Sequence, residues 1–249
     1  MRIISGLLIS LGVLSSAATA YAASPESSNT IATPQMMVVF SAQVETGKND
    51  AVLTAKLYKN ASDSSGAKKS RLTISPDESI VFSVGSTSIH FDPSNLSLNK
   101  LPFVPGAKYT VQFRRFNGEF YSADVVIPPA RPVLTPVENA VVSKTAPVNF
   151  TWVPSKADMG LVGITVGLGC RSKGKFHWTS DTSGTLPAGF VGGCAGVVNA
   201  KFMTFPINST PFSGISGYFS GAIATIRDFS FGAPLMSEPS EIQASTDNL

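Results

Sequence analysis

Charged residues are scarce in this 249-residue chain. Asp, Glu, Lys and Arg make up 14% of it, against roughly 25% in an average soluble domain. The formal net charge is only +3, and the basic residues form no run longer than the pairs Lys68-Lys69 and Arg114-Arg115. Nucleic acid is bound through dense basic patches, so this balance argues against a nucleic-acid partner. We expect both basic pairs to be solvated strand ends.

Residues that carry catalytic chemistry are equally sparse. The chain holds two histidines, His90 and His177, and neither lies in a catalytic motif. There is no Gly-x-Ser-x-Gly elbow, no His-Glu-x-x-His pair and no phosphate-binding loop. Metal sites require clustered His, Cys or carboxylates, and Asp63 is the only carboxylate in the polar loop at residues 59–69. We therefore expect no enzyme, no metal and no cofactor.

Long apolar runs are absent beyond the first residues. Residues 3–14 form a largely apolar run behind Arg2, followed by small residues that end in Ala20-Tyr21-Ala22. This order predicts a secretory signal peptide of bacterial type at residues 1–22, cleaved after Ala22. An uncleaved anchor is the alternative, although the run is short for a membrane span. The mature protein is then periplasmic or extracellular, with no transmembrane anchor.

Cysteine occurs twice, at Cys170 and Cys194. Exported proteins fold in an oxidising compartment, so we predict a disulfide between these two residues. A metal or redox pair is the alternative, but no histidines cluster with them.

Ser, Thr, Gly and Pro are abundant instead, which is typical of short strands joined by many turns. Apolar and polar residues alternate at residues 109–113 and 121–127, and this pattern predicts a β-hairpin. We expect a three-residue loop, Phe116-Asn117-Gly118, with Gly118 in the left-handed conformation. The resulting register pairs Phe113 with Tyr121, Val111 with Ala123, and Arg115 with Glu119 as an opposite-charge pair. Among the other strands, we expect ones at residues 35–44, 51–58, 79–84, 197–205, 217–227 and 239–244.

Residues 101–113, LPFVPGAKYTVQF, resemble the segment that enters the sixth strand of fibronectin type III and related immunoglobulin-like domains. In that segment a Pro-Gly turn precedes a tyrosine whose hydroxyl caps the backbone of the preceding corner, and Tyr109 would be this tyrosine. Residues 133–152 resemble the opening strands of a second such domain, with Val148, Phe150 and Trp152 on one face and Trp152 plugging the core. The resemblance implies an all-β protein with two immunoglobulin-like or fibronectin type III-like β-sandwiches in tandem after a cleaved signal peptide.

A proline-rich joint separates the two units. Residues 128–132, PPARP, predict a stiff polyproline II segment. We accordingly expect a flexible leader at residues 23–34, a first β-sandwich domain at 35–129 and a second at 130–249.

Residues 171–196 combine aromatic side chains with a Gly-rich run, which the predicted disulfide at Cys194 would tether. Phe176, Trp178 and Phe190 are therefore the candidate ligand- or partner-binding residues, because aromatics anchor many interfaces. The alternative is that Phe176 and Trp178 fill the core. The preceding strand also presents Gly163, Thr165, Gly167 and Gly169 on one face, and we interpret that face as a place of close packing, with a flat binding surface as the alternative.

Three functions compete on this basis. The first is a non-catalytic exported binding or structural protein that contacts another exported or cell-surface protein. The second is a glycan-binding module that uses the aromatics of the second domain. The third is a hydrolase whose catalytic residues are too dispersed to recognise. Sandwich folds host unrelated functions, so the resemblance does not choose among them.

Overall fold

The structure of the protein is a computed structural model that describes residues 25–59, 70–154, 156–157, 159–166, 174–179, 181–192, 194 and 196–232; of residues 159 and 174–178 it describes the backbone. Nearly all regular elements in these ranges are β-strands, which confirms the all-β prediction. The predicted signal peptide, the loop at residues 60–69, Cys170 and the strand expected at residues 239–244 lie outside the described residues.

The strands are numbered in chain order. The first eight are β1 (Met36–Glu45), β2 (Asp50–Lys59), β3 (Ser70–Leu72), β4 (Ser79–Val84), β5 (Thr87–His90), β6 (Lys100–Pro102), β7 (Lys108–Arg114) and β8 (Phe120–Val126). The next eight are β9 (Val133–Thr135), β10 (Ala140–Ser143), β11 (Val148–Trp152), β12 (Met159–Val166), β13 (Gly174–Trp178), β14 (Ser183–Leu186), β15 (Val198–Pro211) and β16 (Ser216–Gly232). Three short 3₁₀ turns accompany them: η1 (Ser28–Thr30), η2 (Thr33–Gln35) and η3 (Leu96–Leu98).

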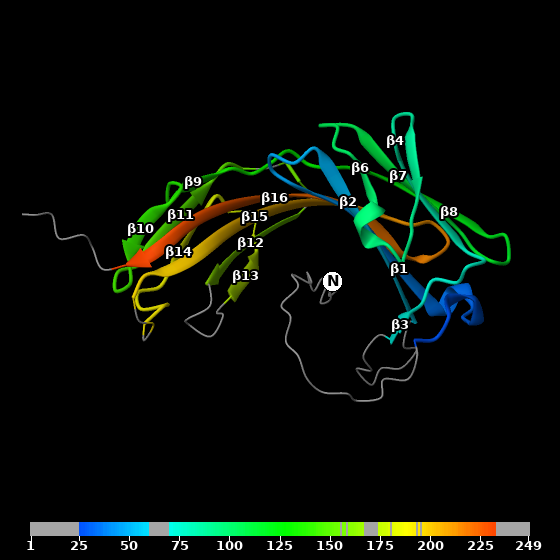
Figure 1. Cartoon of the computed structure of the whole chain (residues 1–249), viewed down its shortest axis with the longest axis horizontal. Coiled ribbons are helices and arrows are strands. Elements are labelled where there is room, and N and C mark those ends of the chain that lie inside the picture. Colours follow the sequence, from blue (N-terminus) through cyan, green and yellow to red (C-terminus); the bar gives the residue numbers. More distant parts are fainter. Residues whose placement is uncertain are drawn as a thin grey trace, which may run out of the picture.

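One long sheet runs through the described part of the molecule (Figure 1). Its strand order is β13-β12-β15-β16-β1-β2-β3, with β10 also paired to β16 and β6 to β2. The hairpin of β15 and β16 supplies the two longest strands, and they lie in the middle of this sheet. On the side of β16 away from β15, residues 216–224 pair in parallel with β1 and residues 229–232 pair in parallel with β10. The 17 residues of β16 therefore join both halves of the sheet.

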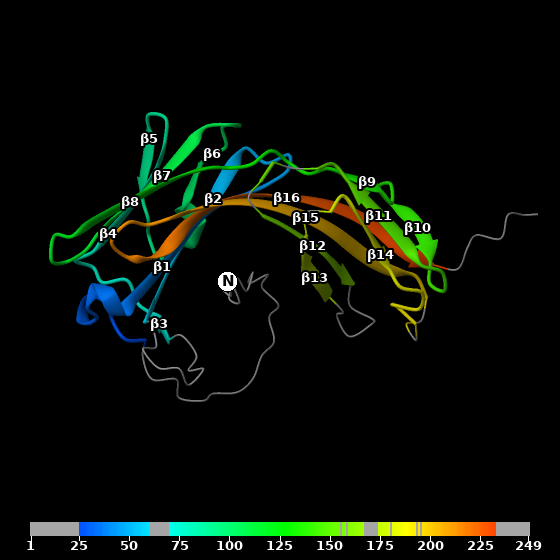
Figure 2. The same ribbon diagram turned by 180° about the vertical axis from the view of Figure 1, so that it is seen from behind.

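Two smaller sheets cover one face of the long sheet. They are the four-stranded sheet β5-β4-β7-β8 and the three-stranded sheet β14-β11-β9. Figures 1 and 2 show both on the outer side of the arch that β15 and β16 form. Side chains alternate between the two faces of a strand, so the odd-numbered residues of β16 all point to this side. Among them, Phe219 and Ile223 enter a first core, and Phe229 and Phe231 enter a second.

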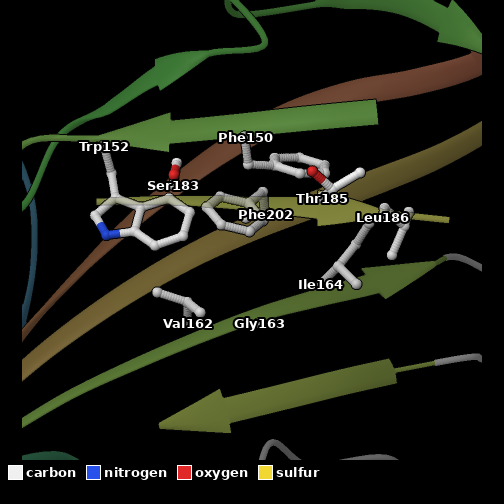
Figure 3. Close-up of a pocket in the computed structure, with 10 residues that line it drawn as sticks. Phe150, Trp152, Val162, Gly163, Ile164, Ser183, Thr185, Leu186 and Phe202 are labelled. Atoms are coloured by element: carbon white, nitrogen blue, oxygen red, sulfur yellow. The ribbon is translucent and has the colours of Figure 1, made fainter. Parts of the chain in front are cut away.

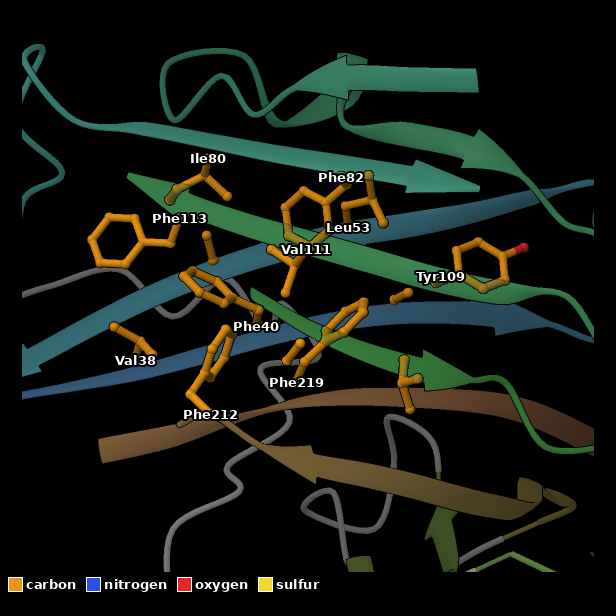
Figure 4. Packing of buried hydrophobic residues seen from close by; sticks show 14 of the residues in the cluster. Val38, Phe40, Leu53, Ile80, Phe82, Tyr109, Val111, Phe113, Phe212 and Phe219 are labelled. Atoms are coloured by element: carbon orange, nitrogen blue, oxygen red, sulfur yellow. The ribbon is translucent and has the colours of Figure 1, made fainter. Parts of the chain in front are cut away.

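Aromatic side chains fill both cores. In the first, the ring of Phe40 packs edge-on against Phe82, Phe113 and Phe212, with ring centroids 6.1, 5.8 and 5.5 Å away (Figure 4). In the second, Phe150 stacks on Phe202 at 4.3 Å. Trp152 is 3% exposed there and shares its buried face with Val148 and Phe150, as the sequence predicted.

The boundary predicted at residue 130 requires a correction. The first core is not confined to residues 35–129, because Phe212, Ile215, Phe219 and Ile223 belong to it. Those residues lie in or beside β15 and β16, which extend well past the strands expected at residues 197–205 and 217–227. The two cores are therefore built on one shared hairpin rather than in two separate stretches of chain.

The predicted hairpin and corner of the first half are confirmed. Phe113 pairs with Tyr121 and Val111 with Ala123, and the loop between the strands has Gly118 at φ +87°. The Tyr109 hydroxyl donates to the carbonyl of Pro102 at 2.8 Å and accepts from the Val104 N–H at 3.0 Å. This is the backbone-capping tyrosine that the resemblance to fibronectin type III domains implied.

Arg115 departs from the prediction. Its backbone N–H donates to the carbonyl of Glu119 at 2.9 Å, so the predicted cross-strand position is confirmed. Its side chain is fully buried and pairs with Glu78, so it is neither a solvated strand end nor the ion-pair partner of Glu119. The guanidinium Nε donates to Glu78 Oε1 at 2.9 Å, and Nη1 donates to the Thr33 hydroxyl at 2.9 Å. Nη2 donates to the carbonyls of Ser28 and Ile31 at 2.8 and 2.9 Å. A buried guanidinium needs partners for its donors, and the segment before β1 supplies most of them.

The leader expected at residues 23–34 is correspondingly ordered from residue 25 onward. Ser28, Ile31 and Thr33 are buried, and the Ser28 N–H donates to the carbonyl of Thr73 at 2.8 Å. Ser28 also donates its hydroxyl to Glu78, so the buried ion pair holds this segment against the first core. The polar composition of this segment predicted a flexible leader. The segment is ordered instead because its backbone carbonyls accept hydrogen bonds from the buried Arg115 guanidinium.

The proline-rich joint is packed against the long sheet between the two cores. Arg131 is 2% exposed; its Nε donates to the carbonyl of Val153 at 3.0 Å, and its guanidinium lies 5.6 Å from the ring centre of Trp152. Burial lowers the pKa of this guanidinium. The Thr204 hydroxyl in β15 donates to the Arg131 carbonyl. Arg131 therefore holds this joint against the sheet through hydrogen bonds to the backbone and a contact with the Trp152 ring.

Candidate functional site

The three candidate aromatics lie in two different settings. Phe176 and Trp178 are in β13, an edge strand of the long sheet, with backbones paired to Gly163 and Leu161 of β12. Their side chains lie outside the described residues, so their binding role stays a prediction. Phe190 is half-buried and packs against the second core, which favours a packing role for that residue.

Cys194 lies on the border of the second core. It is half-buried, and its carbonyl accepts a hydrogen bond from Lys144 Nζ at 2.8 Å. Because Cys170 is outside the described residues, the Cys170–Cys194 disulfide also stays a prediction.

An open pocket of about 230 Å³ enters the second core between the three-stranded sheet and the long sheet (Figure 3). Its walls are mainly apolar: Phe150, Trp152, Val162, Ile164, Leu186 and Phe202. Gly163, Ser183, Gly184 and Thr185 complete it, and we call it the Gly184 pocket. The stacked rings of Phe150 and Phe202 form one wall, and Trp152 lies beside them with its ring centre 5.5 Å from that of Phe202.

The pocket exists because a glycine occupies an inward-facing position of β14. Gly184 is the register partner of Phe150, and Leu186, two residues further on, partners Val148 on the same buried face. A Cβ at Gly184 would lie 3.4 Å from the Trp152 ring, which is ordinary van der Waals contact. An apolar side chain would therefore fit at this position, and its absence leaves the aromatic wall open beside an edge strand.

Polar groups surround the mouth of the pocket without pointing to catalysis. The Thr185 hydroxyl donates to Asn149 Oδ1 at 2.8 Å, and the Trp152 indole N–H donates to the carbonyl of Asp181 at 2.7 Å. No His, Cys, Asp or Glu side chain is part of the described pocket lining. An apolar wall with a few hydroxyls at its rim is suited to hold an apolar group.

The shifted pKa values of acidic residues in the described part have structural causes. A hydrogen bond from the Thr110 hydroxyl, followed by Lys108, lowers the pKa of Asp124. The Thr33 hydroxyl is the main cause of the lowered pKa of Glu119. Both carboxylates belong to the first half of the chain, so neither marks the Gly184 pocket as a reaction centre.

Two further properties concern the described ranges only. No helix there is long and apolar enough to cross a membrane. Nor do three His, Cys, Asp or Glu residues of those ranges lie close enough together to hold a metal ion.

Comparison with known proteins places the chain in no family. No protein-family description matches it, and no curated protein matches it. Its solved structural neighbours include fibronectin domains 1–3 of chicken contactin (CNTN1), with 11% identity and a TM-score of 0.24, covering 76% of this chain and 62% of that one. A second neighbour, from a study of how a 1.5-MDa bacterial ice-binding adhesin is retained at the host cell surface, has 8% identity and a TM-score of 0.22, covering 80% of this chain and 65% of that one.

The chain thus spans less than two thirds of the length of either neighbour. At TM-scores this low, neither similarity supports an argument about function. What the structure itself defines is an all-β protein in which two small sheets pack on one long, shared sheet.

The Gly184 pocket was missed by the sequence reasoning. The Gly-rich run within residues 171–196 predicts a loop, whereas Ser183–Leu186 form an edge strand. The available signal was the alternation in SGTL, where Gly184 precedes Leu186 by two positions and so shares its face. The observation that this face turns inward required the partner strand β11.

Proposed function

We propose that this chain is a non-catalytic, exported binding protein that receives an apolar group of its partner in the Gly184 pocket. The pocket carries the proposal, because it presents three aromatic rings at an opening of the second core where no buried side chain fills the space. Covering apolar surface that is otherwise in contact with water gives roughly 25 cal/mol per Å² of binding free energy.

The size of the pocket sets the size of the group. A dry apolar cavity of about 150 Å³ can hold a benzene ring, and this pocket measures about 230 Å³. One aromatic or branched aliphatic side chain of a partner protein therefore fits it, whereas a large ligand would not be enclosed. The low net charge and the absence of basic runs support a protein partner over nucleic acid. Export rests on the N-terminal signal sequence, and the partner is then another exported or cell-surface protein.

Iodobenzene tests the pocket directly, because its heavy atom quenches the fluorescence of an indole that it contacts. In a Trp178→Phe background, Trp152 is the only tryptophan left. We expect saturable quenching by iodobenzene in that background, retained in Gly184→Ala and lost in Gly184→Leu, whose side chain fills the pocket.

Thermal unfolding of the original chain with and without toluene gives a second measurement. A ligand that binds only the folded state raises the Tm, and Gly184→Leu should abolish that rise. Equal iodobenzene quenching in Gly184→Leu and Gly184→Ala, or no change in Tm with toluene, would contradict the proposal.

A further inference from the structure

A second cavity lies on the opposite face of the long sheet, at the end where β10 joins β16. It measures about 580 Å³. Its polar lining residues are Asn139, Thr165, Asn199, Lys201, Asp228 and Ser230. We call it the polar groove. It is more than twice the volume of the Gly184 pocket, and its chemistry is different.

The strand register brings these side chains together. Thr165 of β12 partners Lys201 of β15, and Lys201 in turn partners Asp228 of β16. Asn199 partners Ser230 one step further along the same face. Val166, Ala200 and Phe229, which alternate with these residues, are buried in the second core. The five polar residues on the strands therefore point away from that core, on the face that the two smaller sheets leave uncovered. The Asn139 N–H donates to the carbonyl of Asp228 at 2.8 Å, which places Asn139 beside them.

The groove is electrically balanced and rich in hydrogen-bonding groups. Lys201 Nζ lies 3.4 Å from Asp228 Oδ1, and both side chains are about half exposed, at 57% and 51%. The two charges offset each other, which disfavours a strongly charged ligand. The amides of Asn139 and Asn199 and the hydroxyls of Thr165 and Ser230 line the groove around the pair.

The backbone excludes one class of ligand. The main-chain groups of β15 are engaged by β12 on one side and β16 on the other, so β15 itself offers no edge to which a peptide strand could add. Recognition here has to use side-chain amides, hydroxyls and the ion pair. Sugar hydroxyls both donate and accept hydrogen bonds, and they complement such a set.

We propose that the polar groove binds a neutral oligosaccharide. This site is separate from the Gly184 pocket, since the two share no polar residue and lie on opposite faces of β12 and β15. The proposal therefore does not depend on the apolar group proposed above.

Isothermal titration calorimetry of the full chain tests the proposal with three neutral probes: cellohexaose, maltohexaose and chitohexaose. We expect at least one of them to bind with a Kd of about 1 mM or tighter. Asn199→Ala and Lys201→Ala should each weaken that binding about tenfold or more, since each removes hydrogen bonds to the ligand. Thr185→Ala, at the rim of the Gly184 pocket, is the matched control and should leave the Kd unchanged.

Three results would overturn the proposal. One is that none of the three hexasaccharides binds. Another is that binding persists unchanged in Asn199→Ala and Lys201→Ala. The third is that Thr185→Ala weakens binding as much as they do, which would move the site to the other face. Loss of hexasaccharide binding together with intact iodobenzene quenching separates a failure of this site from a failure of the Gly184 pocket.

Discussion

Arg115 illustrates how one residue can organise a distant segment. Its guanidinium is fully buried and paired to the equally buried Glu78 carboxylate. The carbonyls of Ser28 and Ile31 and the hydroxyl of Thr33 accept further hydrogen bonds from the guanidinium. Burying a charge is costly unless it is paired and hydrogen-bonded, so the ordered N-terminal segment and the buried ion pair depend on each other.

Replacing Arg115 should therefore destabilise the whole protein. Arg115→Met leaves the Glu78 carboxylate buried without its charged partner, and we expect a loss of about 3–5 kcal/mol in the free energy of unfolding. Urea denaturation followed by circular dichroism measures this loss. The neighbouring Arg114 is exposed, so Arg114→Met should change the unfolding free energy by no more than about 0.5 kcal/mol.

The double variant Arg115→Met/Glu78→Gln sharpens the test. The Glu78→Gln change removes the buried negative charge that Arg115→Met leaves without a partner. The double variant should therefore be more stable than Arg115→Met alone. If Arg115→Met unfolds at the same urea concentration as the original chain, the ion pair does not hold the N-terminal segment.

At the scale of elements, the corner before β7 depends on a single hydroxyl. Tyr109 is 1% exposed, and its hydroxyl bridges the backbone at Pro102 and Val104, so the chain between β6 and β7 is fixed by a side chain five residues further on. Tyr109→Phe leaves the Pro102 carbonyl and the Val104 N–H without this partner. We expect a loss of about 1–3 kcal/mol in the free energy of unfolding. Tyr121→Phe removes a hydroxyl that bonds to Glu119 nearer the surface, and it should cost less.

The same hydroxyl predicts a pH dependence. Burial raises the pKa of Tyr109, so the folded state holds this proton more tightly than the unfolded state. The stability that the protonated Tyr109 hydroxyl gives the folded state is therefore fully present below the unfolded pKa of about 10. This stability is lost as the pH rises through the folded pKa. The difference in unfolding free energy between the original chain and Tyr109→Phe should narrow at alkaline pH. A difference that stays constant or widens above that pH would contradict this assignment.

At the scale of the whole molecule, the β15–β16 hairpin makes the two cores interdependent. In a fragment of residues 25–130, β1 lacks its parallel partner β16 and the first core lacks Phe212 and Phe219. We expect this fragment to show no cooperative thermal unfolding in calorimetry, because it leaves a large apolar face uncovered. Residues 25–232, which keep β16, form the matched control and should unfold cooperatively. A cooperative transition of the short fragment at the Tm of the control would show that the first half is an independent domain.

The sequence alone determined the features that depend on neighbours along the chain. Alternation of apolar and polar residues predicted the strands of the β7–β8 hairpin, and Gly118 identified its loop, because a left-handed turn residue and a period of two are local properties. The buried face of Val148, Phe150 and Trp152 followed in the same way. The Tyr109 corner was implied by the resemblance of residues 101–113 to fibronectin type III domains.

Only the tertiary structure decided which elements share a core. Strand alternation in β16 is the same at Phe219 and at Phe229, so nothing local reveals that the first faces Phe82 and the second faces Phe150. The partner of Arg115 was hidden for the same reason, since Glu78 and Glu119 are equally plausible carboxylates until the fold buries one of them. Gly184 opens a pocket because β14 pairs with β11, and this pairing directs the face of β14 that carries Gly184 toward the long sheet. Contacts between residues far apart in the sequence are set by how the sheets pack, and that packing is a property of the whole chain.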